Sequence, residues 1–215
     1  MIIPQIGYHK DWMDWENLIE RVVTLSGESQ GEEQRGWQRV KVREQGYNDG
    51  VIILGVDPGT ATMGYGVLEK VGNRYRALVY GTLETPKSLP APERLRQLHE
   101  GLHALIEQFQ PDVLVTERLL FSANRRTAIQ VARAIGVALL AAAQHHLPWY
   151  EYTPMQVKQA VTGYGGADKK QVQQMVKRLL ALSELPHPDD AADALALCIC
   201  HAHHESLTRL AEGAR

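Results

Sequence analysis

The sequence predicts an α/β protein built on a mixed five-stranded sheet. Short apolar runs of strand length occur at residues 51–56 and 113–116, and longer stretches carry apolar residues at helical spacing. Their order along the chain is three strands, a helix, a strand, a helix, a strand and then further helices. This order indicates an antiparallel start to the sheet, followed by strands that are joined through helical crossovers.

The first three strands are expected to form an antiparallel meander. Residues 51–56 are almost entirely apolar, as in a strand that is buried on both faces, and Asp57-Pro58-Gly59 ends this strand. Residues 65–68 and 75–83 predict the next two strands, with Gly72-Asn73 turning between them.

The remaining elements alternate between helix and strand. An apolar stripe predicts a helix at 92–109, and Pro111 closes it. A buried strand at 113–117, an alanine-rich helix at about 126–145 and a strand at 149–152 follow. Three helices complete the prediction, at 154–162, 168–182 and 189 to about 209.

The first fifty residues differ from the rest. Trp12, Trp15, Ile19 and Val22 recur at helical spacing and predict an amphipathic helix at 10–25, whereas residues 27–49 lack periodicity and resemble a linker. We therefore expect a dispensable or poorly ordered extension at 1–50, one domain at 51–207 and a tail at 208–215. Two interpretations of the extension remain: a helix that docks on the domain or on a partner, or a natural protein that begins near Val51.

The composition indicates the cellular compartment of the protein, but it does not indicate whether the protein binds nucleic acid. The net charge of −2 neither supports nor excludes a nucleic-acid partner, because a basic surface can be balanced by acids elsewhere. Two cysteines cannot form a disulfide framework, which favours a reducing compartment. No apolar run has the length of a signal peptide or a membrane span, so we expect a soluble cytoplasmic protein.

Four acidic residues form a candidate metal site. Asp57 and Glu117 each end a buried strand, and ligands of open α/β sheets bind beyond the carboxyl ends of strands. Asp190 and Asp193 are three apart, so they share one helix face, and the alanines between them allow that face to approach the sheet. Such carboxylates repel one another unless divalent cations lie among them, and hard oxygen ligands favour magnesium or manganese.

Each acid also has an ordinary structural interpretation. A strand-end acid is often a turn former, and acids in the first turn of a helix complement its dipole. Asp189 fits an N-terminal cap.

An ordered set of motifs then resembles the RuvC family of Holliday-junction endonucleases, over about residues 51–205. The motifs are Ile-Leu-Gly-Val-Asp-Pro-Gly-Thr at 53–60, Gly-Tyr-Gly-Val at 64–67, Phe-Gln-Pro-Asp at 109–112, Glu117, Asn124, Gly-Val-Ala at 136–138, Glu-Tyr-Thr-Pro at 151–154, Gln-Val-Lys-Gln-Ala-Val-Thr-Gly at 156–163, Ala-Asp-Lys-Lys-Gln-Val at 167–172 and Asp-Ala-Ala-Asp-Ala-Leu-Ala at 190–196.

The resemblance implies a ribonuclease-H-like fold and a structure-specific endonuclease. Asp57, Glu117, Asp190 and Asp193 correspond to the family's catalytic, metal-binding acids, which hold two Mg²⁺ ions (Mn²⁺ is possible). The implied reaction is symmetric hydrolysis of phosphodiesters in a four-way DNA junction during recombination and repair. A homodimer that cooperates with the RuvA and RuvB branch-migration proteins is also implied.

The resemblance also implies residues that contact DNA. Lys158 and Lys169 match family positions, and the alternative for these two lysines is a plain solvated helix charge. Arg125 and Arg126 are basic residues that can follow phosphates. Family members commonly carry an aromatic residue three positions after the second acid, near the branch point. This chain has Leu120 there, so either Phe121 substitutes for the aromatic or it is a core residue.

The sequence also suggests two rival functions and one rival metal site. A related nuclease acting on RNA–DNA hybrids or flaps is the first functional rival, and a catalytically idle junction-binding protein is the second; intact acids argue against the second. Cys198, Cys200, His201, His203 and His204 lack the spacing of a zinc site, so we expect buried cysteines and histidines at a solvated helix end.

Overall fold

A computed structural model describes the backbone of residues 50–119 and 125–213, and the side chains of 50–119 and 128–205. The helix expected at 10–25 and the side chains of Phe121, Arg125 and Arg126 therefore lie outside the described residues. The backbone of the two arginines begins a helix.

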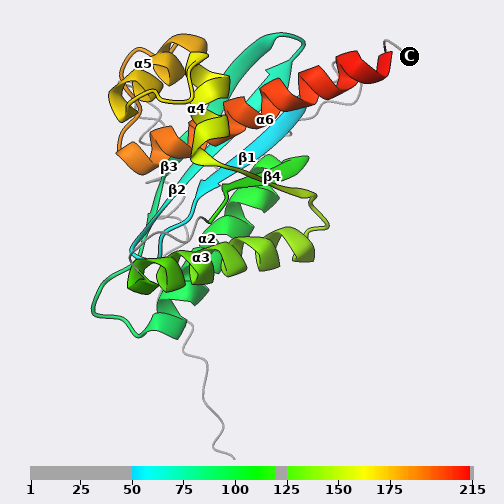
Figure 1. Cartoon of the computed structure of the whole chain (residues 1–215). Coiled ribbons are helices and arrows are strands. Elements are labelled where there is room, and N and C mark those ends of the chain that lie inside the picture. The colour runs from blue at the N-terminus through cyan, green and yellow to red at the C-terminus, as the bar shows by residue number, and fades with distance from the viewer. Residues whose placement is uncertain (1–49, 120–124, 214–215) are drawn as a thin grey trace, which may run out of the picture.

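The sheet has the order β3-β2-β1-β4-β5 (Figure 1). β1 pairs antiparallel with β2 and β2 with β3, whereas β4 runs parallel to both β1 and β5. The mixed five-stranded sheet and its antiparallel start are confirmed. The strands are β1 Val51–Asp57, β2 Thr62–Val71, β3 Arg74–Glu84, β4 Val113–Glu117 and β5 Trp149–Tyr152.

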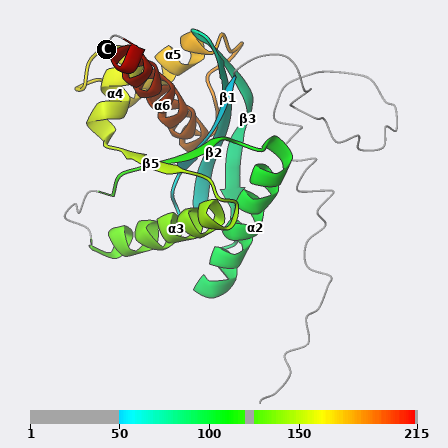
Figure 2. The ribbon, with the colours of Figure 1, turned by 90° about the vertical axis from the view of Figure 1, so that its right-hand side faces the viewer.

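Helices cover both faces of the sheet. Helices α2 and α3 lie on one face, and α4, α5 and α6 lie on the other (Figures 1 and 2). The helices are α2 Ala91–Phe109, α3 Arg125–Gln144, α4 Pro154–Thr162, α5 Lys169–Leu179 and α6 Asp189–Gly213. None of the helices in this part of the chain is long and apolar enough to cross a membrane.

Alternation along the strands divides the core into two layers. Leu54 and Val56 of β1 point to the α2–α3 face, where they join the buried Leu98 and Leu102 of α2. Ile53, the residue directly before Leu54, points to the opposite face, toward α6. The same alternation turns the side chain of Asp57, at the end of β1, toward α6.

Helix α5 ends three residues earlier than predicted. The sequence predicts helix to residue 182, but Ala181 has a left-handed backbone with φ of 50°. The amide of Leu182 donates to the carbonyl of Lys177 at 2.9 Å, and the amide of Ala181 donates to the carbonyl of Arg178 at 3.2 Å. This is the hydrogen-bond pattern of a Schellman motif, with alanine where glycine is usual, so the sequence carries no glycine signal for the helix end.

Candidate active site

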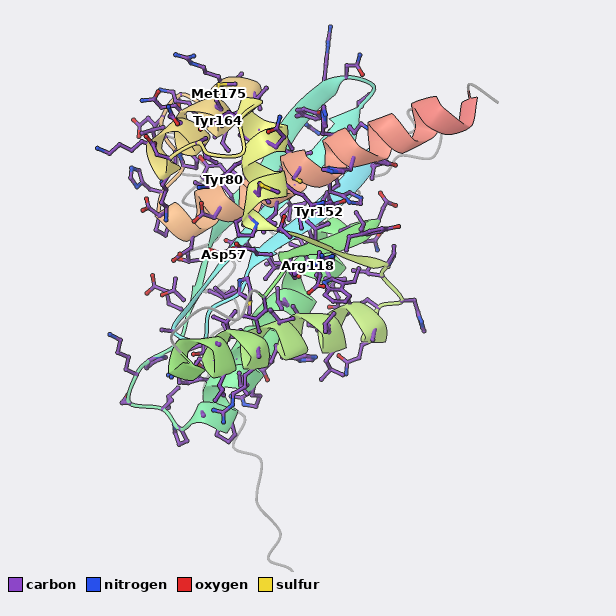
Figure 3. The ribbon with its side chains drawn as sticks, viewed as in Figure 1. Asp57, Tyr80, Arg118, Tyr152, Tyr164 and Met175 are labelled. Atoms are coloured by element: carbon purple, nitrogen blue, oxygen red, sulfur yellow. The ribbon has the colours of Figure 1, made fainter. Side chains whose placement is uncertain are left out.

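Two acids lie at the carboxyl ends of neighbouring parallel strands. The β1–β4 register ends with Val56 opposite Thr116, so Asp57 and Glu117 are the next residues on the two strands. Both follow residues that point to the α2–α3 face, so both point toward α6. In Figure 3, Asp57 lies between α6 above and α3 below, with Arg118 and Tyr152 to its right.

Glycines allow α6 to approach the sheet closely. A Cβ atom at Gly64 of β2 would lie 2.1 Å from the carbonyl oxygen of Asp190, and one at Gly55 of β1 would lie 2.2 Å from that of Ala194. Neither distance is possible between real atoms, so only glycine permits this backbone contact. The helix contributes small buried residues, including Ala191 and Ala194.

The close approach brings three carboxylates together. Oxygen atoms of Asp57, Asp190 and Asp193 lie within 4.8 Å of one another, and among the described side chains this is the one group of acids, histidines and cysteines compact enough to hold a metal ion. Glu117 is outside this group but borders it. Its pKa is raised by burial and by the charge of Asp193, and its own charge raises that of Asp57.

Electrostatics at the site disfavour the charged carboxylates. Burial, followed by the charges of Asp193, Glu117 and Asp190, raises the pKa of Asp57 to about 7. Burial also raises the pKa of Asp193. Acids whose pKa values are raised in this way are typical of functional sites, because a bound cation removes the repulsion between them.

One lysine enters the cluster. The Nζ atom of Lys169, at the start of α5, lies 3.2 Å from Asp193 and 3.3 Å from Asp189. Partial burial opposes its charge, but these contacts outweigh burial and raise the pKa of Lys169. A capping box sets its position, since Asp168 accepts a hydrogen bond from the amide of Gln171 and the Gln171 side chain accepts one from the amide of Asp168.

Three charged residues near the carboxylate cluster occupy different positions around it. Asp189 begins α6, and its carboxylate accepts a hydrogen bond from Gln173 of α5 at 2.9 Å, so it links α5 to α6. Lys158 of α4 is half-buried, and its charge lowers the pKa of Glu117. Arg118 is exposed and lies 3.8 Å from Glu151.

The donor set fits hard divalent cations. Carboxylate oxygens from a strand end and from one helix turn are the ligands that Mg²⁺ and Mn²⁺ prefer. The negative charges crowded around Asp57 also favour a bound cation, because a cation reduces their mutual repulsion. Asp57, Asp190 and Asp193 therefore fit a divalent metal, with Glu117 beside them.

The cysteines and one histidine on α6 belong to the core. Cys198 is fully buried, and its thiol donates to the carbonyl of Gly66 at 3.3 Å. The prediction that the histidines lie at a solvated helix end is wrong for His201, which is 7% exposed. Its Nδ1 atom lies 2.8 Å from the hydroxyl of Tyr152, and this hydrogen bond across the sheet–helix contact allows its burial.

The glycines that allow α6 to approach the sheet are not among the site residues predicted from the sequence. Gly64 and Gly66 face α6 from alternate positions of β2, and Gly55 faces it from β1. Three glycines on one face of two paired strands are the signal for close backbone approach, and they pair with the Asp-Ala-Ala-Asp motif that was recognised.

Comparison with known proteins gives a consistent result. The sequence profile of the family described as crossover junction endodeoxyribonuclease RuvC matches residues 53–201. The chain is 56% identical over 156 residues to the crossover junction endodeoxyribonuclease RuvC of Desulforamulus reducens, covering 73% of this chain and 96% of that protein. Identity to the protein of the same name from Desulfitobacterium hafniense is 56% over 164 residues, covering 76% and 99%.

A solved structure extends the similarity to three dimensions. The fold is similar to that of Thermus thermophilus RuvC in complex with a Holliday junction substrate, with a TM-score of 0.71 and 35% identity over 74% of this chain and 96% of that one. This confirms the expected ribonuclease-H-like fold. The matched profile, the identities and the shared fold together show that the chain belongs to the RuvC family of crossover junction endodeoxyribonucleases.

Proposed function

We propose that this protein resolves Holliday junctions by metal-dependent hydrolysis of phosphodiesters. The observation that carries the proposal is the convergence of Asp57, Asp190 and Asp193, from a strand end and a helix turn, in a chain of this family. Asp57, Glu117, Asp190 and Asp193 are proposed as the catalytic and metal-binding residues. Asp190 is preferred to Asp189, whose carboxylate is engaged by Gln173 and Lys169.

Each side chain has a distinct task in the proposed reaction. Asp57, Asp190 and Asp193 hold a divalent ion, proposed to be Mg²⁺ with Mn²⁺ as a substitute, and Glu117 completes the ligands for a second ion. When bound, such ions activate water and stabilise charge on the attacking and leaving oxygens. Lys169 places its positive charge beside Asp193, where the scissile phosphate must come to lie.

Phosphate contacts are proposed around this site. Lys158 lies near Glu117, and Lys169 lies at the edge of the carboxylate cluster, so both can meet a DNA backbone that enters the site. Phe121, Arg125 and Arg126 are proposed as further DNA contacts from their place in the sequence, between β4 and α3.

A homodimer is proposed to form through α3. Along this helix, Ile129, Ala132, Gly136, Leu140 and Ala143 are all exposed and recur at helical spacing. Ile129 is 55% exposed and Leu140 is 53% exposed, and a Cβ built on Gly136 would have no described atom within 4 Å apart from its chain neighbours and the backbone of its own helix. An apolar stripe with a glycine at its centre fits the same stripe of a second copy, and a two-fold pair supplies two sites for two opposing strands.

Family membership supports the remaining proposals. RuvA and RuvB are proposed as partners that deliver the junction, and the cytoplasm is proposed as the compartment. Residues 1–50 are proposed to be dispensable, because the matched region begins at residue 53 and every element of the site follows it.

The decisive experiment compares cleavage of matched four-way, flap and RNA–DNA hybrid substrates in Mg²⁺. Preference for the four-way junction with paired, symmetric nicks is expected, whereas preference for hybrids or flaps would overturn the proposal. Asp57→Asn, Glu117→Gln, Asp190→Asn and Asp193→Asn should each lower cleavage by more than about a hundredfold. Loss of a residue that only supports a metal ligand already costs up to about a hundredfold, so loss of a ligand itself should cost more. Junction binding should persist, because no phosphate contact is removed.

Asp189→Asn is the matched control. It removes a neighbouring charge of the same helix turn and should reduce cleavage only mildly. A normal rate for any of the other four variants would remove that residue from the proposed set.

Leu140→Glu tests the dimer. It should shift the molar mass in sedimentation toward a monomer and uncouple the two nicks, while Leu185→Glu, at an exposed loop residue, should change neither. A Leu140→Glu protein that stays dimeric would exclude α3 as the interface.

A further inference from the structure

The turn that follows Asp57 is not held by the hydrogen bonds that pair β1 with β2. The last β1–β2 pair is Asp57 opposite Gly64, and β2 itself begins at Thr62. Between the two strands the turn is tight, because a Cβ atom at Gly59 would lie 2.1 Å from the carbonyl oxygen of Thr62. Something other than the β1–β2 ladder must therefore fix the chain directly after Asp57.

Two side chains hold this turn by one backbone carbonyl. The carbonyl oxygen of Thr60 accepts a hydrogen bond from Nη2 of Arg94 at 2.6 Å and another from the hydroxyl of Thr85 at 2.6 Å. Arg94 also donates from Nε to the Thr85 hydroxyl at 2.8 Å. The amide of Thr85 donates to the carbonyl of Ala61 at 3.0 Å, so the two residues hold consecutive peptide groups of the turn.

The arrangement is sheltered from water. Thr60 is 9% exposed and Thr85 is 6% exposed, and Arg94 is half-buried near the start of α2. A hydrogen bond from a charged donor to a buried carbonyl is stronger than one between neutral groups. The three groups are called the Thr60 clamp below.

Arg94 differs from its neighbour in how its charge is used. Arg96, two residues along α2, pairs with the carboxylates of Glu93 and Glu100 on the surface. Within the described residues, Arg94 has no carboxylate partner, and its charge is not among those that shift the pKa of Asp57. Any influence on Asp57 is therefore exerted through the position of the chain and not through a direct charge effect.

The structure assigns to Arg94 and Thr85 a positioning role: they hold the turn so that the Asp57 carboxylate meets Asp190 and Asp193 at the spacing of metal ligands. This inference rests on the proposed metal-dependent function. Asp190 and Asp193 belong to a helix whose backbone packs directly against glycines of the sheet, which fixes its position. Asp57 is the last residue of its strand. A ligand at a strand end needs a support of its own, because a misplacement of about 1 Å is enough to impair a site.

Arg94→Gln tests the role by metal binding to the free protein. Calorimetric titration with Mn²⁺ in the absence of DNA should show about tenfold weaker binding, as is typical when an outer partner of a metal ligand is lost. Cleavage should need a correspondingly higher Mg²⁺ concentration for half-maximal rate and approach the normal rate at saturation. Junction binding in EDTA should be unchanged.

Arg96→Gln is the matched control, since it removes the same charge from the same part of α2 without touching the turn. It should bind Mn²⁺ as the unaltered protein does. Unchanged Mn²⁺ affinity of a folded Arg94→Gln protein, or an equal loss in both variants, would overturn the inference.

Thr85 provides a second route if Arg94→Gln does not fold. Thr85→Val removes the hydroxyl at nearly constant volume and should weaken Mn²⁺ binding, whereas Thr85→Ser should retain it. Equal affinity of these two folded variants also overturns the inference. Failure of the proposed function is a separate result: the unaltered protein would then bind Mn²⁺ without cutting four-way junctions.

Discussion

The two faces of the sheet are packed in different ways. On the α2–α3 face, large aliphatic side chains such as Leu98 and Leu102 fill the space between helix and strand. On the α6 face, glycines of β1 and β2 lie directly against the backbone of the helix, at Gly55 and Gly64. On the first face, side chains separate the helices from the sheet. On the second face, the backbone of the helix lies against the backbone of the strands.

This difference separates stability from positioning. Interdigitated aliphatic side chains stabilise the fold and can shift when one of them changes. Direct backbone contact has no side chain that can adjust, so it fixes where Asp190 and Asp193 lie relative to β1 and β2. The carboxylate cluster occurs on the face that has the least freedom.

Adding one methyl group to each face should give the largest contrast. Gly64→Ala places an atom against the carbonyl of Asp190 and must push α6 away, so we expect loss of cleavage and a destabilisation of about 3 kcal/mol or more. Gly101→Ala in α2 meets the side chain of Leu83, whose two methyl carbons lie at 2.7 and 2.8 Å and can turn away more easily than backbone can, and it gains helix propensity, so its stability should change by less than about 1 kcal/mol. Thermal unfolding and junction cleavage measure both effects; similar losses in the two variants would contradict the comparison.

Truncating the aliphatic face should affect stability alone. Leu102 is fully buried, and Leu102→Ala should lower the free energy of unfolding by about 2–5 kcal/mol. Well below its melting temperature, the variant should still cleave junctions with a normal Mg²⁺ requirement. A marked rise in that requirement would show that the two faces are coupled.

Asp57→Asn should stabilise the metal-free protein. Because the pKa of Asp57 is raised from 3.8 to about 7, the folded protein retains a proton there that the unfolded chain has released. Stability therefore falls as pH rises from about 4 to about 7, and the full penalty is present above pH 7. Asparagine carries no charge, so the variant should gain up to about 4 kcal/mol at pH 8 and little at pH 4.

The measurement is thermal unfolding in EDTA at both pH values. Mn²⁺ should then raise the melting temperature of the unaltered protein more than that of Asp57→Asn. A variant that is no more stable at pH 8 than the unaltered protein would mean that the charged Asp57 carboxylate does not destabilise the metal-free fold.

The smallest effects should come from the lysines at the rim of the α6 face. Lys169→Ala and Lys158→Ala should slow cleavage about tenfold, a change on the scale of one charged hydrogen bond. Each should also reduce by about one unit the slope of log affinity against log salt if it contacts a phosphate. Lys170→Ala, next along α5 and exposed, should do neither; equal behaviour of all three would make them ordinary surface charges.

By itself, the sequence determined the order of the elements and indicated the four acids that are proposed for the site. Buried strands such as residues 113–117 and the helical stripe of α2 appear directly in the pattern of apolar residues, because burial on a sheet or helix imposes a fixed period. The three-residue spacing of Asp190 and Asp193 indicated a shared helix face, and the resemblance to the RuvC family singled out the Asp-Ala-Ala-Asp motif. The end of α5 was missed because Ala181 adopts a backbone conformation that glycine usually signals.

Only the tertiary structure decided how these parts meet. The depth at which α6 sits depends on glycines of two different strands, and the Thr60 clamp joins a turn, a strand end and a helix that are far apart in sequence. The burial of His201 against Tyr152 likewise depends on a contact between residues 49 positions apart. Local periodicity shows which face of an element is apolar, but not which atoms of another element will lie against it, and the spacing of the carboxylates is set by those contacts.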